Sequence, residues 1–207
     1  MYMFFGSLVF GFTTGLSLIV AIGSQNAFVL RQGIRKEHVL ITALVCSLSD
    51  AILITAGASG MGALVERAPL LLVFARVGGF IFLLSYAIFA FRRAVKPEAL
   101  KVSAIQGRTA KISVIGTVLA LTWLNPHVYI DTVLLLGSIA TSQAEGAAYF
   151  AVGAIVASFV WFFALAYAAR FLAPFFAKPK AWQVLDVLVG LLMILFATTL
   201  ILPIITD

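Results

Sequence analysis

Six long apolar runs, separated by short charged segments, constrain this chain more than any other feature of its sequence. A helix needs about 20 apolar residues to cross the hydrocarbon core of a bilayer, and each run is long enough. Charged residues make up only 11% of the 207 residues, less than half the share in an ordinary soluble sequence. The chain is therefore predicted to be an all-α integral membrane protein with six transmembrane helices, at approximately 4–30, 39–65, 69–91, 112–140, 146–173 and 183–205.

Other architectures fit these runs poorly. A membrane β-barrel shows alternating apolar and polar residues rather than long apolar runs. The first run is predicted to be a retained span and not a signal peptide, because no Lys or Arg precedes Arg31 and the uncharged stretch is too long. Cys46 is the only cysteine, so neither an intrachain disulfide nor a cysteine metal cluster is predicted.

The basic residues predict the orientation of the helices, because Lys and Arg close to span ends stay on the cytoplasmic side. Three segments, 31–38, 92–111 and 170–182, hold 12 of the 14 basic residues and are predicted to be cytoplasmic loops. The C-terminus then lies outside, and so does the N-terminus unless the first segment only dips into the membrane. The net charge of +6 thus records orientation, and no nucleic-acid partner is predicted.

The two halves of the chain share weak similarities that indicate a repeat. The first and fourth segments each contain Asn-x-x-Val, beginning at Asn26 and Asn125, and the third and sixth each have a glycine near their starts, Gly79 and Gly190. Duplication of a three-span unit inverts the second copy, and inverted repeats are a common transporter architecture. We therefore expect a single membrane domain over 1–207 with one repeat at about 4–91, the basic loop at 92–111 and a second repeat at about 112–205.

The first and fourth segments are also predicted to be broken helices. Gly23 opens a polar patch, Gly-Ser-Gln-Asn, inside the first segment, and Pro126 interrupts the fourth; proline removes a backbone hydrogen bond from a helix. In transporters built from inverted repeats, substrate tends to bind where such breaks meet. The alternative is a kinked helix without a site, since glycine and proline are frequent in membrane helices.

Asp50 is the strongest single indication of function. It lies 11 residues beyond Val39, which at about 1.5 Å per residue places it roughly 17 Å deep, near the membrane midplane. A charge there costs about 2.5 to 3.5 kcal/mol on insertion scales, so it must be protonated, paired or in a wet cavity. The functional interpretation is a carboxylate that binds a cation or a proton. The alternative is a neutral, hydrogen-bonded aspartate in helix packing.

Further polar residues near the breaks are candidates for the same site. Asn26 and Asn125 offer donors and acceptors that suit an amino-acid ammonium and carboxylate, with Gln25 and Tyr129 as further candidates; the alternative for either asparagine is a hydrogen bond between helices. Asp131 is a candidate that could instead pair with Arg76. His127 lies four residues before Asp131, on the same helix face, and could relay protons or be a packed histidine.

Two strings of the sequence resemble a known family. Residues 17–33 read SLIVAIGSQNAFVLRQG, which is similar to the first-segment signature of the LysE family of lysine/arginine exporters. Residues 122–132 read TWLNPHVYIDT and resemble its fourth-segment motif, and Asp50 falls where its second-segment aspartate would lie. The homoserine/threonine branch typically has proline-glycine-proline in the first segment, whereas this chain has Gly-Ser-Gln-Asn. The resemblance therefore favours the basic amino acid branch.

This resemblance implies export of L-arginine, L-lysine or close analogues across a bacterial inner membrane, with no enzyme activity and no cofactor. Export of a cation against an inside-negative potential costs about 2.3 kcal/mol per 100 mV, and exchange for an incoming proton would cancel that charge movement. We therefore predict proton antiport in which Asp50 binds proton and substrate alternately and His127 assists.

Two other functions fit the sequence less well than amino-acid export does. An exporter of inorganic or metal cations would use Asp50, His127 and Asp131, but such ions favour more oxygen or nitrogen ligands than these, and no metal site is assigned. An intramembrane enzyme would need a nucleophile motif that the sequence lacks. The sequence does not determine the preference between arginine and lysine or the coupling ion. It also does not determine the oligomeric state, and a homo-oligomer is one of the alternatives.

Overall fold

The computed structural model describes residues 2–21, 23–61, 69–95 and 110–206. These residues form helices joined by short connections, and none of them lies in a strand. This confirms the all-α fold class. The longer helices are α1 (Tyr2–Ile19), α2 (Ser24–Arg35), α3 (Val39–Ala56), α5 (Pro69–Val95), α6 (Lys111–Trp123), α9 (Ala147–Ala168) and α10 (Pro179–Thr206). The shorter turns are η1 (Gly57–Met61), α7 (Pro126–Val128), η2 (Tyr129–Leu135), α8 (Leu136–Ser142), η3 (Ala144–Gly146), η4 (Ala169–Leu172) and η5 (Phe175–Ala177).

The helices are long and apolar enough for a multi-pass membrane protein. Four of them could cross a bilayer unaided, and the number rises to 6 if each of two bent helix pairs is one span. Each predicted apolar run coincides with one of these helices or bent pairs. Large apolar side chains such as Phe5, Phe74 and Ile112 are exposed on the outer surface, as expected where lipid is the solvent.

The two bends lie in the first and fourth segments. The helix from Phe4 to Ile19 turns by 83° into α2, and α6 turns by 61° into the helix that begins at Pro126. Gly23 precedes α2 in an extended conformation. Pro126 occupies the first position of α7, where its missing N–H would be unpaired in any helix.

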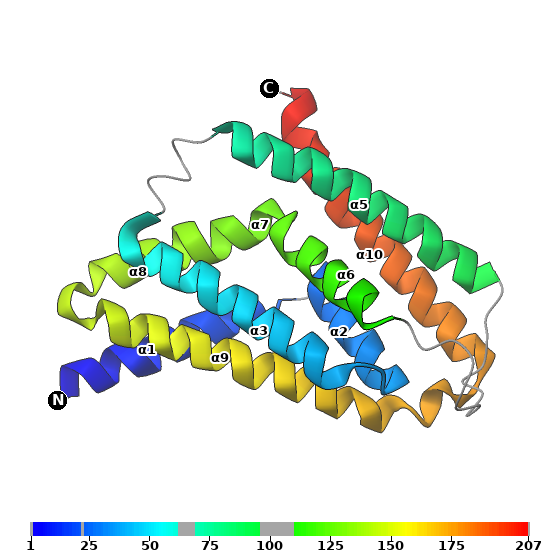
Figure 1. Cartoon of the computed structure of the whole chain (residues 1–207), viewed down its shortest axis with the longest axis horizontal. Coiled ribbons are helices and arrows are strands. Elements are labelled where there is room, and N and C mark those ends of the chain that lie inside the picture. The colour runs from blue at the N-terminus through cyan, green and yellow to red at the C-terminus, as the bar shows by residue number, and fades with distance from the viewer. Residues whose placement is uncertain (1, 22, 62–68, 96–109, 207) are drawn as a thin grey trace.

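The helices pack in pairs around a central group. Helices α5 and α10 run together along one side of the molecule, α1 and α9 along the other, and α2, α3 and α6 lie between them (Figure 1). The core between these elements is formed by small and medium side chains, among them Val29, Ala43, Val118, Ala166 and Met193. This arrangement brings the start of α2 and the middle of α3 against α9.

Glycines allow the closest helix contacts. A Cβ atom added to Gly11 would lie 2.0 Å from the carbonyl oxygen of Phe150, and one added to Gly153 would lie 2.0 Å from that of Leu8. The backbones of α1 and α9 therefore touch, as small residues permit in membrane helices. Gly11 belongs to the Gly-x-x-x-Gly of the first segment, which here serves close packing.

Candidate functional site

Asp50 is buried in the middle of α3. Its carboxylate is 4% exposed, and its Oδ2 accepts a hydrogen bond of 2.8 Å from the Oγ of Ser158 on α9, which is itself fully buried. None of the described basic side chains forms an ion pair with it. Among the residues that the structure describes, the carboxylate at the predicted midplane therefore has one neutral donor and no cation.

Further buried polar groups lie on α3 close to Asp50 in sequence and at the start of α2. Ser47 lies three residues before Asp50, hence on the same helix face, and the side chain of Gln25 from the start of α2 bonds to Cys46, one turn before Asp50. Within the described part of the chain, Ser24 Oγ and Ser47 Oγ are buried and have no hydrogen-bond partner. Buried polar groups are rarely left unpaired, so this cluster is suited to a polar ligand.

Asn26 holds the first break together. Its Nδ2 donates to the carbonyl oxygens of Ile19 at 2.9 Å and of Ala21 at 2.7 Å, near the end of α1. Its Oδ1 accepts from Nε1 of Trp161 on α9 at 3.1 Å. Both ends of the amide are thus occupied within the protein, which agrees with the alternative that Asn26 joins helices.

The second break is held in a comparable way. Asn125 Oδ1 accepts from the backbone N–H of His127 at 3.1 Å and caps α7. The hydroxyl of Tyr129 donates to the carbonyl oxygen of Trp123 at 2.8 Å. Nε1 of Trp123 in turn donates to Ser49 Oγ at 3.3 Å. Because Ser49 precedes Asp50 on α3, the second break is connected to the residue beside the buried carboxylate.

Asp131 and His127 lie apart from this buried cluster. Asp131 is half-buried on η2, and His127 is exposed. The ion pair of Asp131 with Arg76, left open on sequence grounds, is absent: the ion pairs among the described residues join Arg31, Arg35 and Arg93 to Asp186 and Glu37. No three described His, Cys, Asp or Glu side chains gather closely enough to hold a metal ion.

An ion-pair cluster was missed on sequence grounds. Arg31 and Arg93 were expected in loops, but Arg31 lies on α2, 6% exposed, and Arg93 lies on α5. Both donate to Oδ1 of the buried Asp186 on α10, at 2.6 Å and 3.2 Å. One signal in the sequence could have indicated this cluster. Asp186 is an acid inside an apolar run, close to the end of the predicted span that lies on the arginine-rich side of the membrane. Helix α2 therefore continues to Arg35, beyond the predicted limit at residue 30.

The amino-acid sequence matches a known protein family and several named proteins. Residues 16–203 match the family described as LysE type translocator. A protein of Mycobacterium tuberculosis, provisionally named an amino-acid transporter, is 48% identical over 179 residues, which cover 86% of this chain and 89% of that protein. The arginine exporter protein ArgO of Salmonella enteritidis is 45% identical over 188 residues, covering 90% of this chain and 89% of the exporter. No solved structure matches the chain.

Proposed function

The chain belongs to the LysE type translocator family, and from this premise we propose that it exports basic amino acids, arginine above all, by exchange for protons. The resemblance of its two motifs, the 45% identity to an arginine exporter and the buried acid on α3 support the proposal. Lysine is the second substrate considered. The membrane in this proposal is the bacterial inner membrane, with the basic segments 31–38, 92–111 and 170–182 in the cytoplasm and the C-terminus outside; residues 96–109 lie outside the described part of the chain.

The observation that carries this proposal is Asp50, a buried carboxylate bonded to Ser158 and to no cation in the described chain. A buried charge without a partner is unfavourable, whereas a protonated or cation-bound carboxyl is not. A basic amino acid supplies the missing positive charge through its side chain. Ser24 and Ser47 supply further buried hydroxyls, on α2 and α3, that no described residue satisfies.

Proton exchange follows from the same carboxylate in this proposal. Outward movement of one positive charge costs about 2.3 kcal/mol per 100 mV of inside-negative potential. If a proton enters as the amino acid leaves, the net charge movement is zero. Asp50 carries the proton in one half of the cycle and the substrate cation in the other, and these two states exclude each other because both use the same carboxylate.

Access to this carboxylate requires a conformational change. Asp50, Ser158 and Ser47 are buried, so the site is closed to both sides in this conformation. In the proposed cycle, movement at the two breaks opens it, since discontinuous helices border the substrate sites of many secondary transporters. The bonds made by Asn26, Tyr129 and Trp123 hold the closed arrangement.

Counterflow in proteoliposomes tests this function. Vesicles loaded with unlabelled arginine are expected to accumulate labelled arginine, and lysine, ornithine and canavanine should compete whereas homoserine should not. An imposed proton gradient is expected to drive arginine movement without an electrical potential. Net arginine movement that does not respond to the imposed proton gradient would contradict antiport. Absence of counterflow with arginine, lysine, ornithine and canavanine alike would contradict export of basic amino acids.

A further inference from the structure

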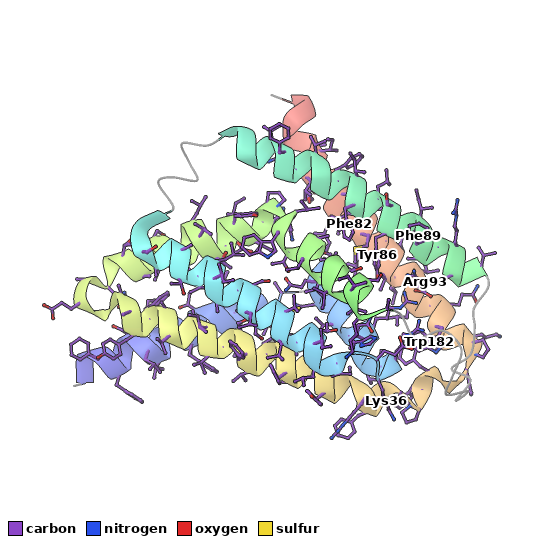
Figure 2. The ribbon with its side chains drawn as sticks, viewed as in Figure 1. Lys36, Phe82, Tyr86, Phe89, Arg93 and Trp182 are labelled. Atoms are coloured by element: carbon purple, nitrogen blue, oxygen red, sulfur yellow. The ribbon has the colours of Figure 1, made fainter. Side chains whose placement is uncertain are left out.

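A second polar region lies at the end of the molecule where the basic residues gather. Figure 2 shows Tyr86, Arg93 and Trp182 at this end, close to Lys36, which follows α2. A cavity of about 270 Å³ opens here between α2, α5 and α6. We call it the basic cavity; its polar lining is Arg31, Gln32, Arg35, Arg93, Ser113 and Thr117, and its apolar lining includes Phe28 and Tyr86.

Two of its arginines are held in fixed positions. Arg31 and Arg93 share Oδ1 of Asp186. The guanidinium of Arg31 lies over the ring of Trp182 at 6.0 Å, and that of Arg93 lies over the ring of Tyr86 at 5.6 Å. Contacts of this kind stabilise a cation by its attraction to the ring face. The arginines are therefore positioned before any ligand binds, which lowers the entropic cost of binding.

The basic cavity also has hydrogen-bonding groups that the described residues leave unpaired. Arg93 Nη2 is a buried donor and Gln32 Oε1 a buried acceptor, and neither has a hydrogen-bond partner among the described residues. Arg35 Nε lies 3.3 Å from Glu37 Oε2 in an ion pair. A buried guanidinium N–H is satisfied best by an oxyanion, to which arginine donates with strong, directed hydrogen bonds. A buried amide oxygen is satisfied by a donor such as an ammonium group. An unpaired donor and an unpaired acceptor in one cavity fit a zwitterion.

The charge of the basic cavity agrees with this ligand. Three arginines line it, and the acids paired with them are Asp186 and Glu37. One positive charge is left over, which attracts the α-carboxylate, while the α-ammonium meets the neutral amide of Gln32. The rings of Phe28 and Tyr86, which meet edge to face at 6.2 Å, offer apolar contact to a carbon chain attached to that carboxylate.

We infer that the basic cavity binds the α-carboxylate and α-ammonium groups of the amino acid on the cytoplasmic side, before its side chain reaches Asp50. The carboxylate binds the guanidinium groups of Arg35 and Arg93, and the ammonium donates to Gln32. This inference rests on the proposed function and adds to it a loading site that recognises the head group common to all amino acids. Asp50 then selects amino acids with a basic side chain over those with a neutral or acidic one.

The test uses arginine transport measured from the cytoplasmic face. In the full-length protein, Arg35→Gln and Arg93→Gln remove cavity donors, and Arg92→Gln removes the same charge from an exposed neighbouring residue. We expect the first two variants to raise the KM for arginine about tenfold, with the maximal rate changed far less, and Arg92→Gln to leave KM within about twofold. Arg35→Gln keeps the test informative if Arg93→Gln fails to fold, because Arg35 does not contact Asp186.

Agmatine, which is arginine without its carboxylate, separates this role from a general effect of charge. Its inhibition of arginine transport should be the same for the unaltered protein and for Arg35→Gln. Equal weakening of agmatine and arginine, or an unchanged KM for arginine, would overturn the loading site while transport by the unaltered protein still supported the proposed function. Absence of arginine transport by the unaltered protein would overturn both.

A phospholipid phosphate offers the same oxyanion chemistry as a carboxylate. The KM measurements are therefore repeated in vesicles of phosphatidylcholine alone and in vesicles that also contain phosphatidylglycerol. A ratio of variant to unaltered KM that is the same in both supports the amino-acid head group. A ratio that falls to one in the absence of anionic lipid would overturn this assignment in favour of a lipid head group.

Discussion

The molecule contains two buried aspartates whose surroundings differ sharply. Asp186 on α10 is 3% exposed and accepts from two guanidinium groups, those of Arg31 and Arg93. Asp50 on α3 is 4% exposed and accepts from one hydroxyl, that of Ser158. Two carboxylates with the same burial thus have opposite electrostatic surroundings. The difference teaches that burial alone does not distinguish these two acids. The lack of a cationic partner among the described residues does, and this is why we propose a transport role for Asp50 and not for Asp186.

The largest effect is expected from breaking the paired site. Asp186→Asn leaves Arg31 buried without an acid, and loss of one partner from a buried ion pair costs about 3 to 5 kcal/mol. We expect a clear fall in the midpoint of thermal denaturation in detergent. The control is the double variant Asp186→Asn with Arg31→Gln, which removes both charges and should recover part of the loss. A single variant as stable as the unaltered protein would contradict a structural role for this pair.

At the unpaired site, stability and transport should respond in the opposite way. Asp50→Asn keeps the shape and the hydrogen bond from Ser158 but removes the charge, so the midpoint of denaturation should change little. Loss of the carboxylate that pairs with the substrate cation is expected to lower arginine transport about 100-fold, which corresponds to roughly 2.7 kcal/mol. The measurement is proton-driven arginine movement in vesicles. Proton-dependent export retained by this variant would rule out Asp50 as the shared carboxylate.

A smaller effect is expected when the hydroxyl partner of the unpaired acid is removed. Ser158→Ala deletes the donor to Asp50 Oδ2, and a hydrogen bond to a charged group contributes about 1.5 to 3 kcal/mol. Because the carboxylate keeps its charge, arginine transport should persist with a changed KM. Ser138→Ala, at an exposed serine on α8 that bonds only to backbone, is the matched control. An identical KM for both variants would show that Ser158 has no influence on the carboxylate.

The smallest effect is expected at the ion pair nearest to water. Arg35 and Glu37 lie 3.3 Å apart with side chains 30% and 17% exposed, and pairs close to the surface contribute about 0 to 1 kcal/mol. Glu37→Gln should therefore shift the denaturation midpoint far less than Asp186→Asn does. Equal shifts for these two variants would contradict the view that burial determines how much a paired acid stabilises this protein.

The sequence was sufficient for the features that depend on short stretches of chain. The place of Asp50 in the middle of a long apolar helix follows from the uncharged run around it, and the bend before Pro126 follows from the chemistry of proline. The predicted limit of the first segment was too short, because a rule that ends a helix at the first arginine overlooks an arginine neutralised by an acid from another helix. Asp186 lies 155 residues from Arg31 in the sequence. No local sequence pattern indicates that two residues so far apart in the chain are in contact.

The roles of the asparagines were harder to predict for the same reason. Asn26 was a candidate for substrate because it carries both donors and acceptors. The structure uses those groups on the carbonyl of Ile19 at the end of α1, on that of Ala21 just beyond it, and on Trp161, a residue of the other half of the chain. Asn125 caps its own helix turn, which the sequence pattern Asn-Pro could have indicated. The roles of residues whose partners are distant in sequence could be assigned only from the tertiary structure.

Helix α9 carries two of these contacts less than one turn apart. Ser158 bonds to the carboxylate of Asp50, and Trp161 bonds to Asn26 at the first break. Any slide or rotation of α9 that withdraws one side chain from its partner also withdraws the other, and α1 must follow because its backbone touches that of α9 at Gly11 and Gly153. In the proposed cycle, a movement of α9 as a rigid unit would therefore act on the buried acid and on the first bend together.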